Sequence, residues 1–236
     1  MYDVIVLGAT FAAAGIAHTY QKNCLILEQG FQAGNEFYGA LQFGSEYDKK
    51  PKHPQAVEFL EKFMGNSLYT RHTEIYPYLQ EADVLFGTQV TLIQKTEKGF
   101  QCVIHGCQGF YTYEAKQIID TRSNEKISTS KTFNLFVESD EAPSFPGVTA
   151  EKTGVEKHYI LRLPMSLSCG YQEARAMVMD VVQQFSETQR LILSASTFDY
   201  QIGENYPKTQ DGVLCLPSKA YKNPVMAFEA GLEVAL

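Results

Sequence analysis

Two short apolar runs, separated by a stretch of small residues, dominate the start of the chain. The runs span residues 4–7 and 24–27, and continuous apolar runs of this length indicate strands that are buried on both faces. Small side chains at 12–15 predict a helix that packs closely, and Gly8 provides the tight turn before it. Glu28 ends the second run. The order strand, turn, helix, strand and acid predicts the first half of a parallel βαβ unit.

Such a unit builds an anion site at the start of its helix. The first turn of an α-helix has N–H groups without acceptors and carries the positive end of the helix dipole, so it attracts a pyrophosphate. Here Gly8 and the backbone of Thr10, Phe11 and Ala12 supply these donors. Glu28 follows Gly8 by twenty residues, where a carboxylate at a strand end accepts both hydroxyls of an adenosine ribose. We therefore predict a dinucleotide site; a purely structural turn and a solvated acid are the alternative.

The glycine pattern of this turn departs from Gly-x-Gly-x-x-Gly/Ala at one position. Gly8 and Ala13 fit the first and third positions, whereas Thr10 stands at the middle one, where the backbone comes closest to the phosphates. A β-branched side chain there either crowds the pyrophosphate or donates its hydroxyl to it. The sequence leaves both alternatives open.

Periodicity predicts further helices and strands along the rest of the chain. Residues 30–44 are rich in glycine and aromatic residues and predict an ordered loop. Helices are expected at 53–64 (with Gly65 as C-cap), 74–82, 171–185 and 225–234 (with Pro224 in its first turn), and strands at 84–93, 100–105, 110–114, 116–120, 134–137, 158–165, 191–195 and 214–216.

These elements predict an α/β fold in which a Rossmann-like domain carries a three-stranded meander and a smaller inserted α+β region. We assign residues 1–124 and 189–236 to the nucleotide-binding domain and 125–188 to a substrate or cap region. Strand 191–195 is expected to return to the nucleotide sheet. About sixty residues lie between, which is marginal for a separate core, so we expect a wall over the site.

Composition narrows the range of partners. A net charge of −7 over 236 residues argues against nucleic acid and anionic membranes as partners, and no apolar run approaches the ~20 residues of a membrane span. The N-terminus has no basic segment before its apolar run, so we expect a cytoplasmic protein without a signal peptide. The sequence leaves open whether the chain binds a protein partner or forms a homo-oligomer.

The five cysteines are scattered and odd in number, which does not fit a disulfide framework. Cys102, His105 and Cys107 could suggest a metal, but they alternate along a predicted hairpin and no second ligand pair follows. We therefore expect no metal site. Cys169 precedes helix 171–185, where a thiolate would be stabilised, although a structural cysteine is the more common case.

Two arginines, Arg162 and Arg122, each have a functional and a structural interpretation. His158 and Arg162 share one strand face and could bind an anionic substrate, or they are exposed strand polarity. Arg122 follows the strand that ends at Asp120, where it could contact a phosphate or carboxylate, or be solvated.

Three stretches carry a resemblance to a known family: residues 2–30, residues 87–90 with 115–121, and residues 214–236. In them the chain resembles the FAD-dependent oxidoreductases of the glutathione-reductase-like FAD fold. The resemblance implies FAD as cofactor, a small organic substrate, and hydride transfer from that substrate to the flavin. The cofactor-binding residues that the turn, spacing and resemblance suggest together are Gly8, Thr10, Phe11, Ala12, Glu28, Gln29, Val90, Thr121, Ser218 and Asn223. Of these, the resemblance implies that Val90 contacts the adenine, with plain core packing as the alternative.

The chain departs from this family at identifiable positions. Asp120-Thr121-Arg122 stands where Ala-Thr-Gly is usual, and Leu216-Pro217-Ser218 stands where the family has a Gly-Asp whose aspartate holds the ribityl chain. No nucleophile–base pair is evident, which matters less in flavoenzymes because the cofactor carries the redox chemistry. These departures and Thr10 favour an alternative, a non-catalytic paralogue that acts as a binding or partner subunit, whereas the intact Glu28 and the preserved order of elements favour the enzyme.

Overall fold

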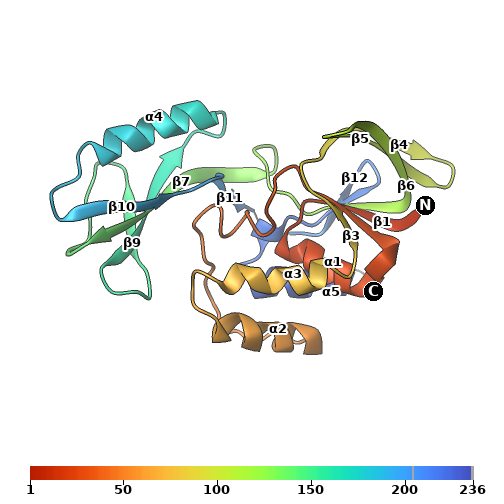
Figure 1. Cartoon of the computed structure of the whole chain (residues 1–236), viewed down its shortest axis with the longest axis horizontal. Coiled ribbons are helices and arrows are strands. Elements are labelled where there is room, and N and C mark those ends of the chain that lie inside the picture. The colour runs from red at the N-terminus through yellow and green to blue at the C-terminus, as the bar shows by residue number, and fades with distance from the viewer. Residues whose placement is uncertain (204, 235–236) are drawn as a thin grey trace. The chain divides into compact units, whose positions relative to one another are not determined.

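The computed structural model describes residues 1–203 and 205–234, which divide into two compact units (Figure 1). The first unit comprises Met1–Gly34, Phe43–Arg122 and Glu204–Leu236. The second comprises Asn35–Gln42 and Ser123–Gly203. Each unit has its own sheet.

The first unit is built on an eight-stranded sheet with a parallel centre. Its strand order is β12-β13-β6-β1-β2-β3; β1 lies parallel to β2 and β6, while β4 and β5 extend the sheet as an antiparallel meander with β6. The predicted Rossmann-like sheet and its meander are confirmed. The strands are β1 (Tyr2–Leu7), β2 (Cys24–Leu27), β3 (Asp83–Leu85), β4 (Gln89–Thr96), β5 (Gly99–Gly106), β6 (Gly109–Asp120), β12 (Lys208–Gln210) and β13 (Val213–Cys215).

Two strand predictions in this sheet are wrong. The run 84–93 is split into β3 and β4, because Gly87 turns the chain at a positive φ of 64°. Residues 110–114 and 116–120, expected as two strands, form the single strand β6. Its first half pairs with β5 and its second half with β1, and Ala115 pairs with both neighbours.

Helices cover one face of this sheet: α1 (Phe11–Tyr20), α2 (Pro54–Gly65), α3 (Tyr76–Leu79) and α5 (Pro224–Val234). Gly65 is the last residue of α2 rather than its C-cap, and the cap is the extended Asn66. The expected helix 74–82 is shorter: a 3-10 turn, Arg71–Ile75, leads into α3, and Pro77 lies in the first turn of α3.

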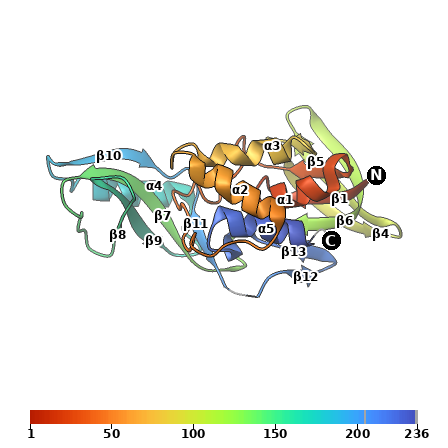
Figure 2. The same ribbon diagram turned by 90° about the horizontal axis from the view of Figure 1, so that it is seen from below.

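Two glycines bring α1 and α5 into backbone contact. The helices lie side by side in Figures 1 and 2. A Cβ added at Gly15 would lie 2.2 Å from the carbonyl oxygen of Phe228, and one at Gly231 would lie 2.0 Å from that of Ala12. No residue other than glycine fits at either position without separating the helices.

A second apolar layer fills the meander side of the sheet. It consists of Ile5, Leu7, Leu25, Leu27, Phe100, Cys102, Ile104, Ala115 and Ile118. The central strands are thus buried on both faces, as their continuous apolar runs predict.

The second unit is a five-stranded antiparallel sheet with one helix, α4 (Tyr171–Val182), along one face (Figure 1). The strand order is β10-β7-β9-β8, and β11 pairs with the first part of β7. The strands are β7 (Ser128–Ser139), β8 (Thr149–Lys152), β9 (His158–Met165), β10 (Gln189–Ser194) and β11 (Asp199–Ile202).

The prediction that strand 191–195 returns to the nucleotide sheet is wrong. This strand, β10, pairs antiparallel with β7, with Leu191 opposite Val137. The chain re-enters the first sheet through β12 and β13 instead. The long β7 provides the edge that β10 and β11 share, since it extends well beyond the predicted residues 134–137.

The glycine contact between α1 and α5 gives the first prediction. Gly231→Ala places a methyl group against the Ala12 carbonyl, and we expect the free energy of unfolding to fall by about 2 kcal/mol although alanine favours helix. Gly65→Ala is the matched control, because nothing lies within 4 Å of its added Cβ. Urea unfolding of both variants checks this, and equal stability of the two would contradict the close contact.

Candidate nucleotide site

The turn after β1 places the start of α1 at the carboxyl edge of the parallel strands. Gly8 adopts a φ of 95°, and its N–H donates to the carbonyl of Leu27 at the end of β2 (2.8 Å). Thr10 is the N-cap of α1. The first turn of α1 has no acidic side chain, so no carboxylate there competes with an anion for the positive end of the helix dipole. Apart from Phe11, its side chains are small and apolar.

The Thr10 side chain points into the unit. Its hydroxyl donates to Oγ1 of Thr121 (2.8 Å) and accepts the N–H of Ala13 (3.1 Å), and the residue is 5% exposed. Thr121 in turn donates to the carbonyl of Leu7 (2.9 Å). In this arrangement the hydroxyl caps the first turn of α1 and gives its proton to Thr121, so it has no spare proton for a phosphate.

Both carboxylate oxygens of Glu28 bind backbone N–H groups of the neighbouring turns. Oε2 accepts from Ala9 (2.8 Å) and Oε1 from Gly30 (2.6 Å). The main chain of Glu28 is held between Leu85 and Thr88 by hydrogen bonds of 2.9 Å each. Each carboxylate oxygen has a second lone pair. Glu28 therefore braces the turn and can still accept ligand hydroxyls.

An ion pair lies against the same turn. Arg122 donates through Nε and Nη2 to the two carboxylate oxygens of Asp120 (2.9 and 2.8 Å), and this hydrogen bonding raises the pKa of Arg122 above its usual value. A Cβ added at Gly8 would lie 2.7 Å from Cγ of Arg122. The arginine that replaces the usual glycine thus packs its stem on the Gly8 turn.

The two C-terminal candidates have structural partners. Ser218 is buried, and its N–H donates to the carbonyl of Thr121 (3.0 Å). Asn223 caps α5, since its Oδ1 accepts the N–H of Met226 (2.9 Å), and its Nδ2 donates to the carbonyl of Ser45 (2.8 Å). Both lie in the first unit with the Gly8 turn, but their contact with a flavin stays a prediction.

Val90 and Gln29 lie in different surroundings. Val90 pairs with Ile104 and packs against the apolar layer under the meander. Gln29 is exposed beside Glu28. Adenine contact by Val90 stays a prediction, and its packing accounts for the residue without a ligand.

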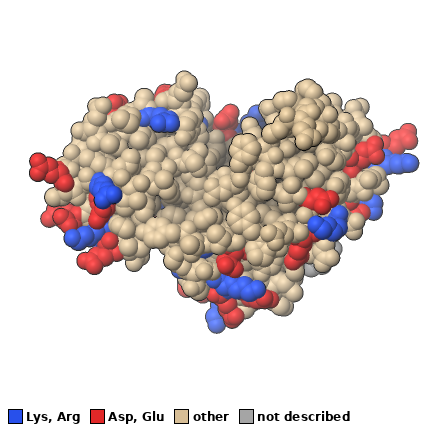
Figure 3. Space-filling view, in the orientation of Figure 1, with Lys and Arg blue, Asp and Glu red and all other residues tan. Residues whose placement is uncertain are grey.

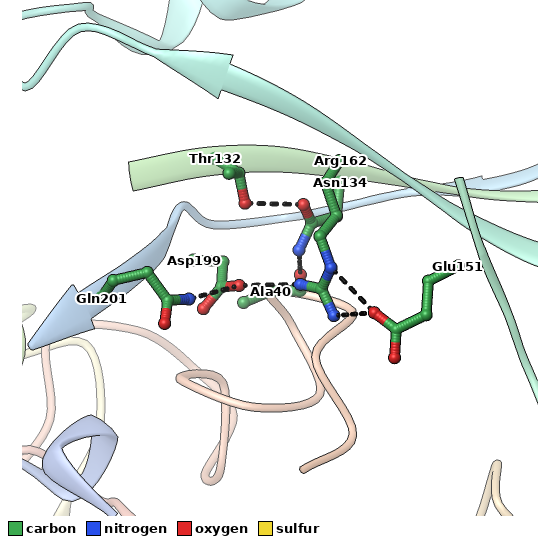
Figure 4. Close-up of polar contacts among 7 residues, drawn as sticks. All are labelled: Ala40, Thr132, Asn134, Glu151, Arg162, Asp199 and Gln201. Atoms are coloured by element: carbon green, nitrogen blue, oxygen red, sulfur yellow. Dashed lines mark hydrogen bonds and ion pairs between the residues drawn. The ribbon is translucent and has the colours of Figure 1, made fainter. Parts of the chain in front are cut away.

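The second unit has a network of polar side chains on the sheet face opposite the one that bears Phe133 and α4 (Figure 4). Arg162 donates through Nε and Nη2 to Glu151 (3.0 and 2.6 Å) and through Nη1 to the fully buried Asp199 (3.1 Å). Gln201 donates to the same Asp199 oxygen (3.1 Å). Two carboxylates thus balance the Arg162 cation, which does not favour the predicted use of this residue to bind an anionic substrate.

Asn134, opposite Arg162 on the neighbouring strand, forms a separate set of hydrogen bonds that reaches the segment before α2 in the chain. Its Oδ1 accepts from Thr132 (2.7 Å), and its Nδ2 donates to the carbonyl of Ala40 (2.8 Å; Figure 4). Sequence reasoning missed Asp199 and Asn134. The only signal was their polar character within otherwise apolar strand patterns.

Cys169 lies in surroundings that do not favour a thiolate. Burial raises the pKa of the Cys169 thiol, which argues against a stabilised thiolate.

Among residues 1–203 and 205–234, no three His, Cys, Asp or Glu side chains gather as a metal site would require. Within the same ranges, every helix is too short or too polar to cross a membrane. Cations and carboxylates are interspersed on the face drawn in Figure 3, and ion pairs such as Lys62–Glu58 occur on the surface.

Comparison with curated sequences does not identify a family for the chain. No protein-family model matches the chain. It is similar to the protein translocase subunit SecA of Phocaeicola vulgatus at 22% identity over 157 residues, which are 65% of this chain and 13% of that protein. That similarity is too low and too partial to show a family.

Solved structures are similar over nearly the whole chain. Anhydrotetracycline hydroxylase OxyS of Streptomyces rimosus has a TM-score of 0.61 at 12% identity, covering 99% of this chain and 60% of the hydroxylase. Aklavinone-11 hydroxylase, solved with FAD and aklavinone, has a TM-score of 0.57 at 11% identity, with coverages of 99% and 61%. The p-nitrophenol 4-monooxygenase of Pseudomonas putida has a TM-score of 0.59 at 10% identity, covering 100% of this chain and 77% of the monooxygenase.

The chain spans about three fifths of the length of the first two hydroxylases. At such identities the similarity establishes the fold and not the activity. The chain has the α/β, Rossmann-like fold of these hydroxylases and monooxygenases, one of which is solved with FAD bound.

Proposed function

We propose that the chain binds FAD in its first unit and acts as an FAD-dependent oxidoreductase on a small organic molecule. The observation that carries the proposal is the Glu28 carboxylate, held by two backbone N–H groups beside the start of α1. This arrangement offers a ribose acceptor and a pyrophosphate donor set side by side.

The residues present fit this cofactor. Thr10 keeps its side chain buried against Thr121 and Ala13, so a phosphate at this turn would be held by backbone donors and not by the Thr10 hydroxyl. The backbone of Phe11 and Ala12 would donate to that phosphate, and Gly8 provides the turn. Arg122 adds a cation beside the same turn, although Asp120 shares its charge.

When bound, FAD supplies a ring system that accepts or delivers a hydride. The residues of this chain would bind and orient the cofactor. The fold neighbours named above include aklavinone-11 hydroxylase and p-nitrophenol 4-monooxygenase, which supports a small organic substrate. We propose hydride transfer between that substrate and the flavin as the reaction, and the finer likeness to glutathione-reductase-like enzymes is part of the same proposal.

A second candidate function is a non-catalytic binding or partner subunit. The observation that favours it is the C-terminal site, where the family resemblance calls for an aspartate and the chain has the buried Ser218. Anaerobic mixing of the FAD-loaded protein with NADH, NADPH and aromatic alcohols or phenols distinguishes the two. Bleaching of the flavin absorbance supports the enzyme, whereas bound flavin that no reductant bleaches supports the partner subunit.

Substitution of Glu28 tests the ribose contact. Glu28→Gln keeps the size and one acceptor oxygen but removes the charge, and we expect FAD binding to weaken by about 1–3 kcal/mol. Glu61→Gln, exposed on α2, is the matched control. Titration calorimetry with FAD measures both, and thermal unfolding reports any loss of the bonds to Ala9 and Gly30. Unchanged affinity of Glu28→Gln would remove Glu28 from the site.

Substitution of Thr10 separates a structural from a ligand role. Thr10→Val removes the cap and the bond to Thr121, so we expect the free energy of unfolding to fall by about 1–2 kcal/mol while FAD affinity changes little. Thr10→Ser should preserve both quantities. Denaturant unfolding and fluorescence titration give the two numbers. A valine variant of normal stability that binds FAD poorly would show that the hydroxyl contacts phosphate after all.

A further inference from the structure

One large aromatic side chain lies in water beside the proposed ribose site. Phe31 is 83% exposed, and it follows Gly30, whose N–H donates to the carboxylate of Glu28 (2.6 Å). A single exposed apolar residue is common and needs no explanation. Phe31 differs from such residues in two respects. It lies three residues after Glu28, the proposed ribose acceptor, and a backbone segment supports its ring.

Gly87 supports the Phe31 ring. A Cβ added at Gly87 would lie 2.7 Å from Cε1 and 3.2 Å from Cζ of Phe31, so the ring rests directly on the backbone there. That backbone is fixed, since Gly87 donates to the carbonyl of Gly30 and Thr88 to that of Glu28, each at 2.9 Å. Gly87 itself has a φ of 64°, which favours glycine. The ring is therefore held from one side and open to solvent on the other.

We propose that Phe31 is the stacking platform for the adenine of the bound dinucleotide. A nucleoside carries its base directly beside its ribose, so a ribose held by Glu28 brings the base to the neighbouring side chains. Phe31 offers an open aromatic face at that place, whereas the predicted adenine contact Val90 is packed against the apolar layer. This inference rests on the proposed function and names one further residue of its site.

Stacking on an open ring has a defined chemical signature. Every base has a π-face, so stacking on an aromatic side chain tolerates a change of base. Stacking does not read the base, and the other predicted adenine contact, Val90, has no polar group to do so; the site should therefore bind ADP and GDP with similar affinity. Riboflavin lacks the adenosine half, so its affinity should not depend on Phe31.

The experiment is titration calorimetry of the full chain with ADP, GDP, FAD and riboflavin. We expect Phe31→Ala to weaken ADP and FAD binding about tenfold, and Phe31→Tyr to retain the affinity of the wild type. Tyr69→Ala is the control, since Tyr69 is a half-exposed aromatic of the same unit that lies before α3. Phe31 is exposed, so the melting temperature of Phe31→Ala should match that of the wild type.

The outcomes separate this inference from the proposed function. Wild-type protein that binds FAD and ADP together with a Phe31→Ala variant of equal affinity overturns the platform and leaves the FAD site standing. A Phe31→Ala variant that loses riboflavin affinity as much as ADP affinity also overturns it. Wild-type protein that binds neither ADP nor FAD overturns both.

Discussion

The backbone contact between α1 and α5 fixes where the helix start can lie. Gly15 and Gly231 let each helix reach the main-chain oxygens of the other, and α5 is capped by Asn223, which also ties down the loop at Ser45. A helix held this closely cannot slide along its axis without a clash. The first turn of α1 is therefore presented at the carboxyl edge of the sheet, where open α/β folds bind their ligands.

Around that turn, the departures from the usual FAD pattern are accommodated inside the unit. Thr10 replaces a glycine and buries its hydroxyl between Ala13 and Thr121, so the substitution adds a cap to α1 and a hydrogen bond to Thr121. Arg122 replaces another glycine and lies on Gly8, with Asp120 as its counter-ion. A comparison of motif letters counts Thr10 and Arg122 as two departures, whereas in the structure each side chain has a partner within the unit and α1 stays capped.

Much of the first unit could be predicted from sequence because its signals are local. The apolar runs of β1 and β2, the small residues of α1 and the position of Glu28 each depend on near neighbours. The partner of β10 could not be predicted, since its apolar residues fit either sheet and only β7 decides the pairing. The direction of the Thr10 side chain and the partners of Arg162 depend on residues far along the chain, which spacing does not reveal.

The central claim is that this chain holds FAD at the Gly8 turn. The most direct measurement is the visible absorption spectrum of the purified protein after incubation with FAD and gel filtration, with the released cofactor identified by mass spectrometry. We expect a two-band flavin spectrum at one FAD per chain, and its loss when Glu28 and Phe31 are both replaced by alanine. A colourless wild-type protein, or a flavin that stays bound in the double variant, would contradict it.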